Sequence, residues 1–146
     1  MTSPTFPRLF TGCWRDEIDD AKFLRIGISR MSPRGMRGYR TFPRLFPGKW
    51  WRDIVDPVEW AARYRTDILG PLDAAEVVEQ LSAMAGDRVP VLQCWETMSP
   101  PSGWCHRALV GVWLFDELGL QVPELGYDGA GCGHRHPKLP AELRQT

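Results

Sequence analysis

Val89-Pro-Val-Leu-Gln-Cys-Trp95 is a short, largely apolar stretch with turn residues on both sides. A run of this length and composition is typical of a strand that is buried on both faces of a parallel sheet. A loop rich in Ser, Pro and Gly follows it. From Cys105 onward, apolar residues recur at helical spacing up to Leu118, and Gly119 is a stop signal. A strand, a loop and a helix in this order predict an α/β domain.

The residues on either side extend this unit. Phe23-Leu-Arg-Ile-Gly-Ile-Ser29 predicts another strand. Two helices are predicted over residues 57–69 and 73–86, because Asp56 and Asp73 mark their starts and Gly70 and Gly86 mark their ends. Residues 120–125 are assigned to a last short strand. This order predicts a compact Rossmann-like three-layer domain with a mostly parallel central sheet, in which ligands bind at the carboxyl ends of the strands.

The 146 residues are expected to form one domain with three parts. Residues 1–52 form a basic segment of arginines and aromatic residues with the first strand, residues 53–125 form the α/β core, and residues 126–146 form a tail rich in Gly, His and Pro. The basic segment has 11 Lys and Arg against 4 Asp and Glu, although the net charge of the chain is zero. These arginines either pair with the acidic helices that follow or bind an anionic ligand.

Neither a membrane span nor an export signal is found in the sequence. No apolar run reaches the ~20 residues that a membrane helix needs, and the N-terminal stretch lacks the apolar segment of a signal peptide. We therefore expect a cytoplasmic protein with no membrane partner. Thiols in such a protein are usually reduced, so we expect its four cysteines to be unpaired. The oligomeric state is left open.

A short repeat and an arginine-rich connection mark the basic segment. Thr5-Phe-Pro-Arg-Leu-Phe10 recurs as Thr41-Phe-Pro-Arg-Leu-Phe46. Because Pro excludes the interior of a strand or helix, we expect two irregular loops that either pack on the core or hold a base or phosphate. Between the two copies, Arg30, Arg34 and Arg37 lie in a glycine-rich connection, where they are candidates for binding phosphate.

The main candidate site lies between the buried strand and the last helix. Glu96 follows the carboxyl end of the strand, and Cys105, His106 and Arg107 begin the helix. Glu96, partly desolvated by neighbouring tryptophans, is a candidate acid, base or nucleophile, with His106 and Cys105 as further catalytic candidates. His106 and Arg107 lie at a helix N-terminus, where an anion is favoured, so Arg107 is assigned to phosphate binding.

Two segments of this site resemble a known family. Leu92-Gln-Cys-Trp-Glu96, followed by Trp104-Cys-His-Arg-Ala-Leu-Val110, resembles the Cys-x-Glu … Cys-His-Arg signature of domain-of-unknown-function family 488. Arg8-Leu9 and Ile28-Ser-Arg30 with Pro33 are similar to N-terminal motifs of its small single-domain branch. The resemblance implies a compact Rossmann-like domain with a shared site and no settled activity. Residues after Gly126 depart from the pattern.

Three classes of function stay open. A carboxylate beside an anion-binding helix start, with arginine loops and aromatic residues, is similar to the sites of enzymes that cleave or exchange N-glycosidic bonds. This favours a hydrolase or glycosyl transferase that acts on a nucleotide or nucleic-acid base. The second class is a non-catalytic module that binds nucleic acid or protein, in which Arg107 pairs with Glu96. The third is a thiol-dependent enzyme with Cys105, at a helix N-terminus, as the nucleophile.

Six soft ligands also suggest a metal site, although no cofactor is required by the other hypotheses. Zinc binds Cys and His side chains, and all three histidines of the chain lie close to cysteines in the sequence. The candidate zinc ligands are Cys94, Cys105, His106, Cys132, His134 and His136.

Overall fold

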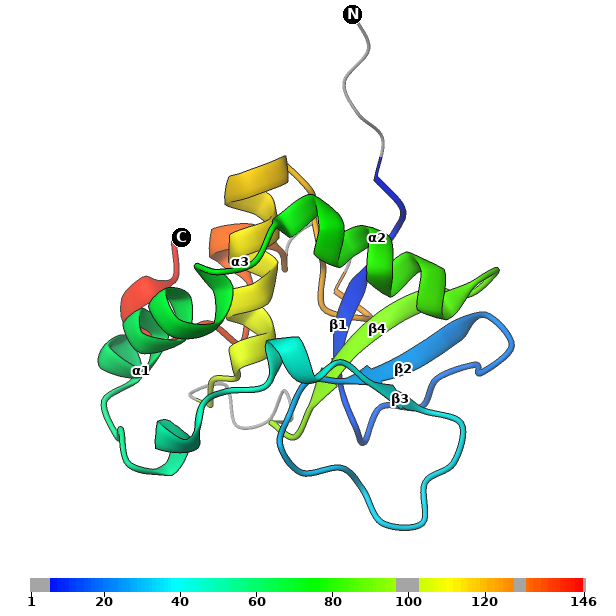
Figure 1. The fold of residues 1–146 in the computed structure, drawn as a ribbon, viewed down its shortest axis with the longest axis horizontal. Helices are drawn as coiled ribbons and strands as arrows, with labels where there is room; N and C mark the ends of the chain where they lie inside the picture. The colour runs from blue at the N-terminus through cyan, green and yellow to red at the C-terminus, as the bar shows by residue number, and fades with distance from the viewer. Residues whose placement is uncertain (1–5, 97–102, 128–130, 146) are drawn as a thin grey trace, which may run out of the picture.

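The computed structural model describes residues 6–96, 103–127 and 131–145. Its centre is a parallel four-stranded sheet with the strand order β1-β4-β2-β3 (Figure 1). The strands are β1 (Phe10–Cys13), β2 (Phe23–Gly27), β3 (Arg40–Thr41) and β4 (Val89–Cys94). β4 pairs with β1 along one edge and with β2 along the other, so it is a central strand, and consecutive buried residues along it show that both of its faces are covered. The predicted α/β fold with a parallel sheet is therefore confirmed.

In the described ranges, three helices and several short turns complete the fold. The helices are α1 (Pro57–Tyr64), which continues as a π-turn over Arg65–Leu69, α2 (Ala74–Ala85) and α3 (His106–Leu118). Single 3-10 turns span Pro43–Leu45, Lys49–Arg52, Gly133–Arg135 and Ala141–Leu143. The carboxylates of Asp56 and Asp73 accept the N–H of the residue three positions on, which fixes the starts of α1 and α2 as the sequence predicted. Gly119, with φ +67°, ends α3.

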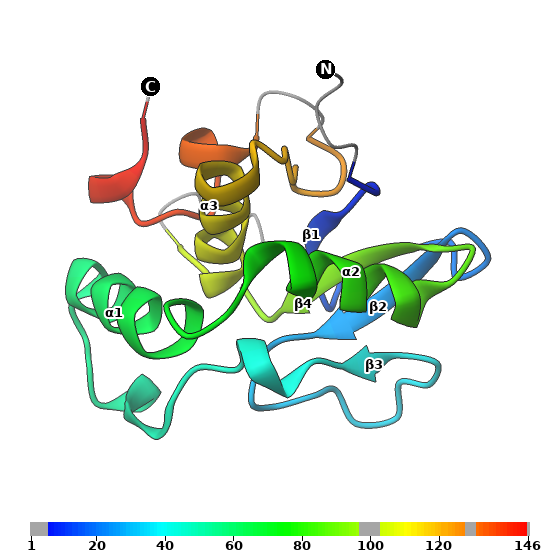
Figure 2. The same ribbon diagram turned by 45° about the horizontal axis from the view of Figure 1, so that its top comes forward.

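One face of the sheet carries the main core. Side chains alternate between the two faces of a strand, so Leu24 and Ile26 of β2 share a face with Leu92 of β4. These three residues form one buried cluster with Val77 of α2 and Val112 of α3. Both helices therefore cover the same face, and the second view shows α2 lying over β4 (Figure 2).

The opposite face is covered by the segment that joins β1 to β2. Arg25 of β2 donates from its guanidinium to the backbone oxygens of Trp14 and Asp16 and to the Gln93 side chain. Trp14 is buried against this face. The sequence predicted helices on both faces; in the part of the chain that the structure describes, the layer on this side is a loop, because only nine residues join the two strands.

Several segments differ from their predicted structure. β1 and β3 were not predicted, since the Pro of each repeat copy argued against a strand. The first copy leads directly into β1, whereas the second forms a 3-10 turn over Pro43–Leu45. The stretch 120–125 forms only a single parallel bridge, between Glu124 and Thr11. The two repeat copies therefore share a sequence but not a structure.

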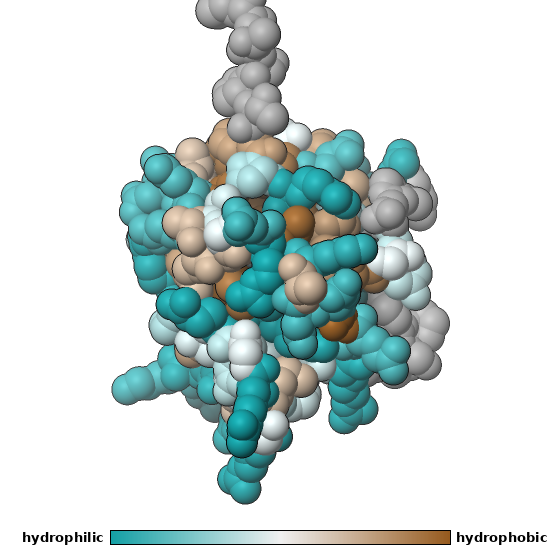
Figure 3. Space-filling view, turned by 90° about the vertical axis from the view of Figure 1, so that its right-hand side faces the viewer, coloured by the Kyte–Doolittle hydropathy of each residue, from teal (hydrophilic) through white to brown (hydrophobic). Residues whose placement is uncertain are grey.

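The last residues are not a peripheral tail. His136 and Lys138 are fully buried, and the backbone oxygen of Lys138 accepts the N–H of Cys105 at the start of α3. The C-terminal segment thus forms part of the core. No helix among the described residues is long and apolar enough to cross a membrane. The face on the right-hand side of Figure 1 is largely hydrophilic, with hydrophobic side chains in small separate spots (Figure 3).

The close contact between Gly27 and Trp14 gives a first prediction. A Cβ atom at Gly27 would lie 2.5 Å from Cζ2 of the buried Trp14 ring. We expect Gly27→Ala to lower the free energy of unfolding by about 1 to 3 kcal/mol, because the indole has to shift in a packed interior. Denaturant unfolding of purified protein measures this change.

Gly111→Ala is the matched control for this prediction. Gly111 lies inside α3, where the nearest atom outside the helix backbone would be 3.6 Å from the new Cβ. Alanine stabilises a helix interior by about 0.5 to 1 kcal/mol relative to glycine, so this variant should be as stable as the original or more stable. Equal effects of the two substitutions would show that the Trp14 contact is not the cause.

Candidate functional site

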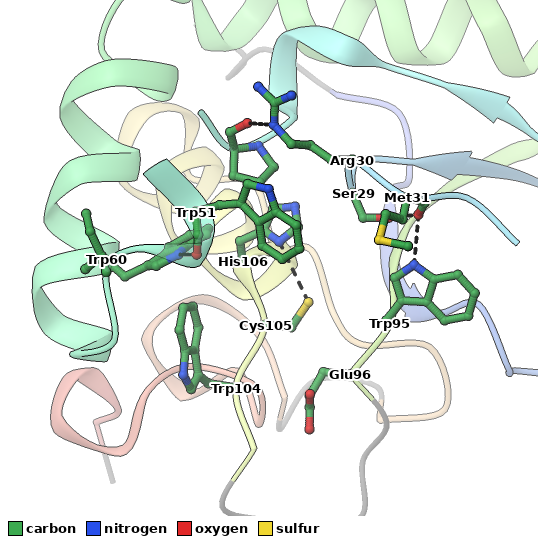
Figure 4. A pocket seen from close by; sticks show the side chains of 12 residues that line it. Ser29, Arg30, Met31, Trp51, Trp60, Trp95, Glu96, Trp104, Cys105 and His106 are labelled. Atoms are coloured by element: carbon green, nitrogen blue, oxygen red, sulfur yellow. Dashed lines mark hydrogen bonds between the residues drawn. The ribbon is translucent and has the colours of Figure 1, made fainter. Parts of the chain in front are cut away.

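A cavity of about 270 Å³ lies where β4 ends and α3 begins (Figure 4). Four indole rings line it, those of Trp51, Trp60, Trp95 and Trp104. The polar residues on its wall are Ser29, Arg30, Glu96, Cys105 and His106. The carboxyl end of a parallel strand thus forms a cavity, as the sequence predicted, and most of its surface is apolar.

Hydrogen bonds and ring contacts hold the tryptophans in place. Trp60 donates from Nε1 to the backbone oxygen of Trp51, 3.0 Å away, and its ring packs edge-on against Trp104 at 5.0 Å between centroids. On the other side of the cavity, Trp95 donates from Nε1 to the backbone oxygen of Met31 at 2.8 Å. These contacts fix apolar walls against which a planar ring could stack.

His106 lies at the base of the cavity as a neutral imidazole. Its Nε2 lies 2.8 Å from the backbone oxygen of Ile28, and because a carbonyl only accepts, Nε2 carries the proton. Burial and, to a smaller extent, the nearby Arg107 charge lower the pKa of His106 to about 4, although the hydrogen bond to Ile28 raises it. The other ring nitrogen, Nδ1, lies 4.0 Å from Sγ of Cys105. It therefore presents a lone pair toward sulfur.

Cys94 and Cys105 form a disulfide, which contradicts the expectation of four reduced thiols. The bond joins the last residue of β4 to the residue before α3, because the sheet brings the strand end and the helix start together. Cys105 lines the cavity, whereas Cys94 is buried and does not line it. Cys13 and Cys132 lie outside this bond.

Arg107 is not a phosphate ligand in this structure. It is fully buried and makes a bidentate ion pair with Glu124, with Nε to Oε1 at 2.9 Å and Nη2 to Oε2 at 2.8 Å. Its third nitrogen, Nη1, donates to Sγ of Cys94 at 3.3 Å. The prediction that Arg107 binds an anion is therefore wrong, and so is the alternative that it pairs with Glu96. The Arg107 side chain is buried in the interior of the protein and does not line the cavity.

A buried polar network surrounds the Arg107–Glu124 pair. The hydroxyl of Thr11 donates to Glu124 at 2.8 Å and accepts from Nε2 of His136 at 2.7 Å. Nδ1 of His136 accepts the backbone N–H of Lys138, so both ring nitrogens of His136 are occupied. Burial alone would raise the pKa of Glu124, but the His136 and Arg107 side chains outweigh it and hold the pKa at about 2.

Glu96 lines the cavity at the end away from His106. A Cβ atom at Gly103 would overlap its carboxylate, so the glycine leaves room for Glu96 at the cavity wall. In Figure 4 the carboxylate lies beyond Cys105, on the side of Trp104. Glu96 and His106 thus belong to the same cavity without touching each other. The segment that follows Glu96 lies outside the described residues.

The predicted arginines divide into two groups. Arg30 lines the cavity and is held at its edge by a hydrogen bond from Nε to the backbone oxygen of Pro47 at 2.7 Å. Arg34 and Arg37 are exposed in the loop between β2 and β3 and do not line the cavity. Of the three, the structure brings only Arg30 to the site.

The six predicted metal ligands do not gather in one place. The ligand atoms of Cys94, Cys105 and His106 lie within 4.8 Å of one another, close enough to bind a metal ion. His134 instead lies 2.7 Å from the carboxylate of Asp116, and His136 belongs to the buried Glu124 network. Cys132 lies beside His134 at another hollow of the surface. The described residues of the tail therefore add no ligand to the group of three.

Sequence reasoning missed Glu124 and two of the four tryptophans. Glu124 lies in a stretch with no motif, and only its bridge to β1 places it beside Arg107. Trp51 follows the second repeat copy and Trp60 falls within the predicted helix over residues 57–69, and nothing in the sequence indicates that they meet. Their approach depends on how the turn over Lys49–Arg52 folds back toward α1, which local sequence does not reveal.

Comparisons with models of protein families, with curated proteins and with solved structures found no match to this chain. The resemblance to domain-of-unknown-function family 488 therefore stays a prediction.

Proposed function

We propose that the cavity binds a nucleobase-bearing ligand, a nucleotide or a nucleic-acid base, and that Glu96 assists cleavage or exchange of its N-glycosidic bond. The observation that carries this proposal is the convergence of four indole rings and one carboxylate in a single cavity. Aromatic side chains bind bases by stacking, which contributes about 1 to 3 kcal/mol per base. The cavity volume, about 270 Å³, is on the scale of a small ligand.

Arg30 supports a ligand that carries phosphate. Its guanidinium lies at the edge of the cavity and is oriented by Pro47. A phosphate attached to the sugar of a stacked base would extend out of the cavity toward this charge, where Arg favours phosphate oxygens. Exposed arginines farther along the same loop, Arg34 and Arg37, would add to the attraction of a polyanion such as nucleic acid.

Glu96 is the group suited to the chemical step. When the bond between the sugar C1′ and the base nitrogen breaks, positive charge develops on the sugar, and a nearby carboxylate stabilises it. Water then adds to C1′, and its proton leaves with the departing base, so that hydrolysis yields a free base and a sugar. A second base in place of water would give exchange, because its ring nitrogen forms the new bond to C1′ and its proton passes to the departing base. His106, with its Nε2 proton committed to Ile28, does not take part in this step.

The proposal is tested by incubating the protein with nucleosides, nucleotides and DNA that contains modified bases, and by measuring free base by chromatography. Stacking on the indole rings should also quench tryptophan fluorescence in a saturable way. Quenching without release of base would leave a non-catalytic binding module, which is the alternative function. Absence of both would overturn the proposal.

Zinc binding is a second candidate function, favoured by the group of Cys94, Cys105 and His106. Two thiolates and one imidazole are typical zinc ligands, and the hydrogen bond from His106 to Ile28 would orient the ring for coordination through Nδ1. A disulfide sulfur is a poor ligand, so the site requires reduced cysteines.

We expect the reduced protein to retain about one zinc ion per chain after dialysis, and the oxidised protein to retain none. Elemental analysis measures both states. Equal zinc contents in the two states, or no zinc in the reduced protein, would remove this function. A cytoplasmic location, which we still infer from the sequence, would keep the cysteines available for metal.

A further inference from the structure

We propose that Cys94 and Cys105 form a redox-active pair that exchanges with low-molecular-weight thiols and disulfides through Cys105. This activity goes beyond the proposed function at Glu96 and does not depend on it. The geometry that points to it is the unequal placement of the two sulfur atoms, one at the cavity and the other buried against an arginine.

The two cysteines differ in their access to a reaction partner. Cys105 lines the cavity and has an exposed fraction of 7%, whereas Cys94 has 1% and lies outside the cavity wall. A thiolate can therefore reach the disulfide only from the Cys105 side. Attack on a disulfide requires an approach along the bond, so the sulfur that is attacked is set by which side is open.

Cys94 is placed to be the leaving group. Arg107 donates from Nη1 to its Sγ at 3.3 Å, while the other two guanidinium nitrogens are held by Glu124. A positive charge at this distance stabilises a thiolate, and a better stabilised thiolate leaves faster. The ion pair with Glu124 fixes the guanidinium in this position. The buried Arg107 would then stabilise the Cys94 thiolate in addition to its role in the ion pair.

The backbone separation fits a pair that also exists as two thiols. The Cα atoms of Cys94 and Cys105 are 7.2 Å apart. Most protein disulfides have Cα atoms about 4.4 to 6.8 Å apart, so the Cα–Cα distance of this pair exceeds the range that is usual for a permanent disulfide. Cys105 also lies at the start of α3, where the helix N-terminus favours a thiolate after the bond opens.

The exchange balances as two thiol–disulfide steps. A thiolate attacks Sγ of Cys105, the bond between the cysteines breaks, and the electron pair leaves on Sγ of Cys94 beside Arg107. A second thiol then attacks the sulfur of the bound small molecule in the mixed disulfide and releases Cys105. Two small thiols are oxidised to one disulfide, the protein pair is reduced, and two protons are taken up by the cysteine sulfurs. The reverse sequence reduces a small disulfide.

Glutathione, reduced and oxidised, is a suitable probe for this exchange. The unmodified protein is equilibrated in glutathione buffers of graded ratio, quenched, alkylated and mapped by mass spectrometry. We expect Cys94 and Cys105 to change state together, as one two-electron couple. A pair that keeps one state across the whole range would overturn the proposal.

Single substitutions separate the two sulfur atoms. With oxidised glutathione, the Cys94→Ser protein should accumulate a mixed disulfide on Cys105. In the Cys105→Ser protein, glutathione should modify Cys94 at least roughly tenfold more slowly than it modifies Cys105 in the first variant, because Cys94 is shielded. Modification of Cys94 at an equal or greater rate would contradict the assignment. Cys13→Ser is the matched control, since Cys13 lies outside the disulfide, and it should exchange like the unmodified protein.

Two further measurements keep the proposal open to refutation. If either variant fails to fold, the reduced unmodified protein is alkylated with iodoacetamide and the rates of the two cysteines are compared. Cys105 should react before Cys94, and the opposite order would refute the proposal. Glu117→Gln, exposed near the far end of α3, should exchange at an unchanged rate. Base release and thiol exchange are separate assays of the same protein, so failure of one is distinguished from failure of the other.

Discussion

Replacing Glu124 by Gln is expected to lower the free energy of unfolding by about 3 to 5 kcal/mol, which is the typical cost of removing one partner from a buried ion pair. Glu124 and Arg107 are both almost fully buried, and the variant would leave the guanidinium charge without its carboxylate in the interior. A loss of this size is a large part of the stability of a small domain. Urea unfolding followed by circular dichroism measures it.

The exposed pair of Arg63 and Asp67 provides the control. These residues lie one helical turn apart at the surface, and both side chains are at least one third exposed. Asp67→Asn should therefore cost less than about 1 kcal/mol. Replacing both buried partners, as Arg107→Met with Glu124→Leu, should recover much of the loss, because no charge remains unpaired. A Glu124→Gln protein as stable as Asp67→Asn would show that the buried pair is not essential to the fold.

The same pair predicts how stability responds to acid. The pKa of Glu124 is about 2 in the folded protein and 4.5 when unperturbed, so the unfolded chain binds a proton at this group before the folded one does. Its stabilising contribution is complete above pH 4.5 and is lost as the pH falls from 4.5 toward 2. Glu124→Gln should lack this part of the pH dependence, which urea unfolding at several pH values would reveal.

Glu96→Gln is expected to reduce base release by roughly 10²- to 10⁴-fold, the range in which a catalytic acid, base or charge-stabilising carboxylate contributes. Glutamine keeps the shape of the side chain but not the charge that would stabilise a sugar cation. The four tryptophans are unchanged, so tryptophan fluorescence should report nearly the same ligand affinity. The loss should therefore lie in turnover and not in binding.

Stability distinguishes a catalytic Glu96 from a structural one. Its side chain is only partly buried, so Glu96→Gln should change the free energy of unfolding by no more than about 0.5 kcal/mol. Glu117→Gln is a suitable control because Glu117 lies exposed near the far end of α3, and this variant should keep both stability and activity. If Glu96→Gln unfolds the protein, the carboxylate is structural. If the folded variant retains full activity, the carboxylate has no catalytic role.

The sequence predicted the elements whose signals are local. The apolar run that became β4 and the periodic residues of α3 carry their own pattern, and Asp56 and Asp73 mark helix starts through bonds to residues three positions away. The general rule for parallel sheets then placed Glu96, Cys105 and His106 at one end of the sheet, and all three line the cavity. The order of the elements and the direction of the strands were sufficient to predict where these three residues lie.

Other properties of the site required the tertiary structure. Arg107 looked like an anion ligand at a helix start, and only the return of residues 120–125 to β1 supplies Glu124 as its buried partner. The disulfide spans 11 positions, and Trp51 lies 9 positions before Trp60, but each contact crosses a loop or turn whose path has no periodic pattern. Trp104 joins these two rings from a segment that is distant in sequence.

By itself, then, the sequence determined the fold class, the helix limits and the end of the sheet at which the site lies, because periodicity and capping act over a few residues. The tertiary structure decided which charges are paired, which sulfur faces the cavity and which rings form its walls. Those outcomes depend on long-range packing, where a buried charge takes whichever partner the fold brings within hydrogen-bonding distance.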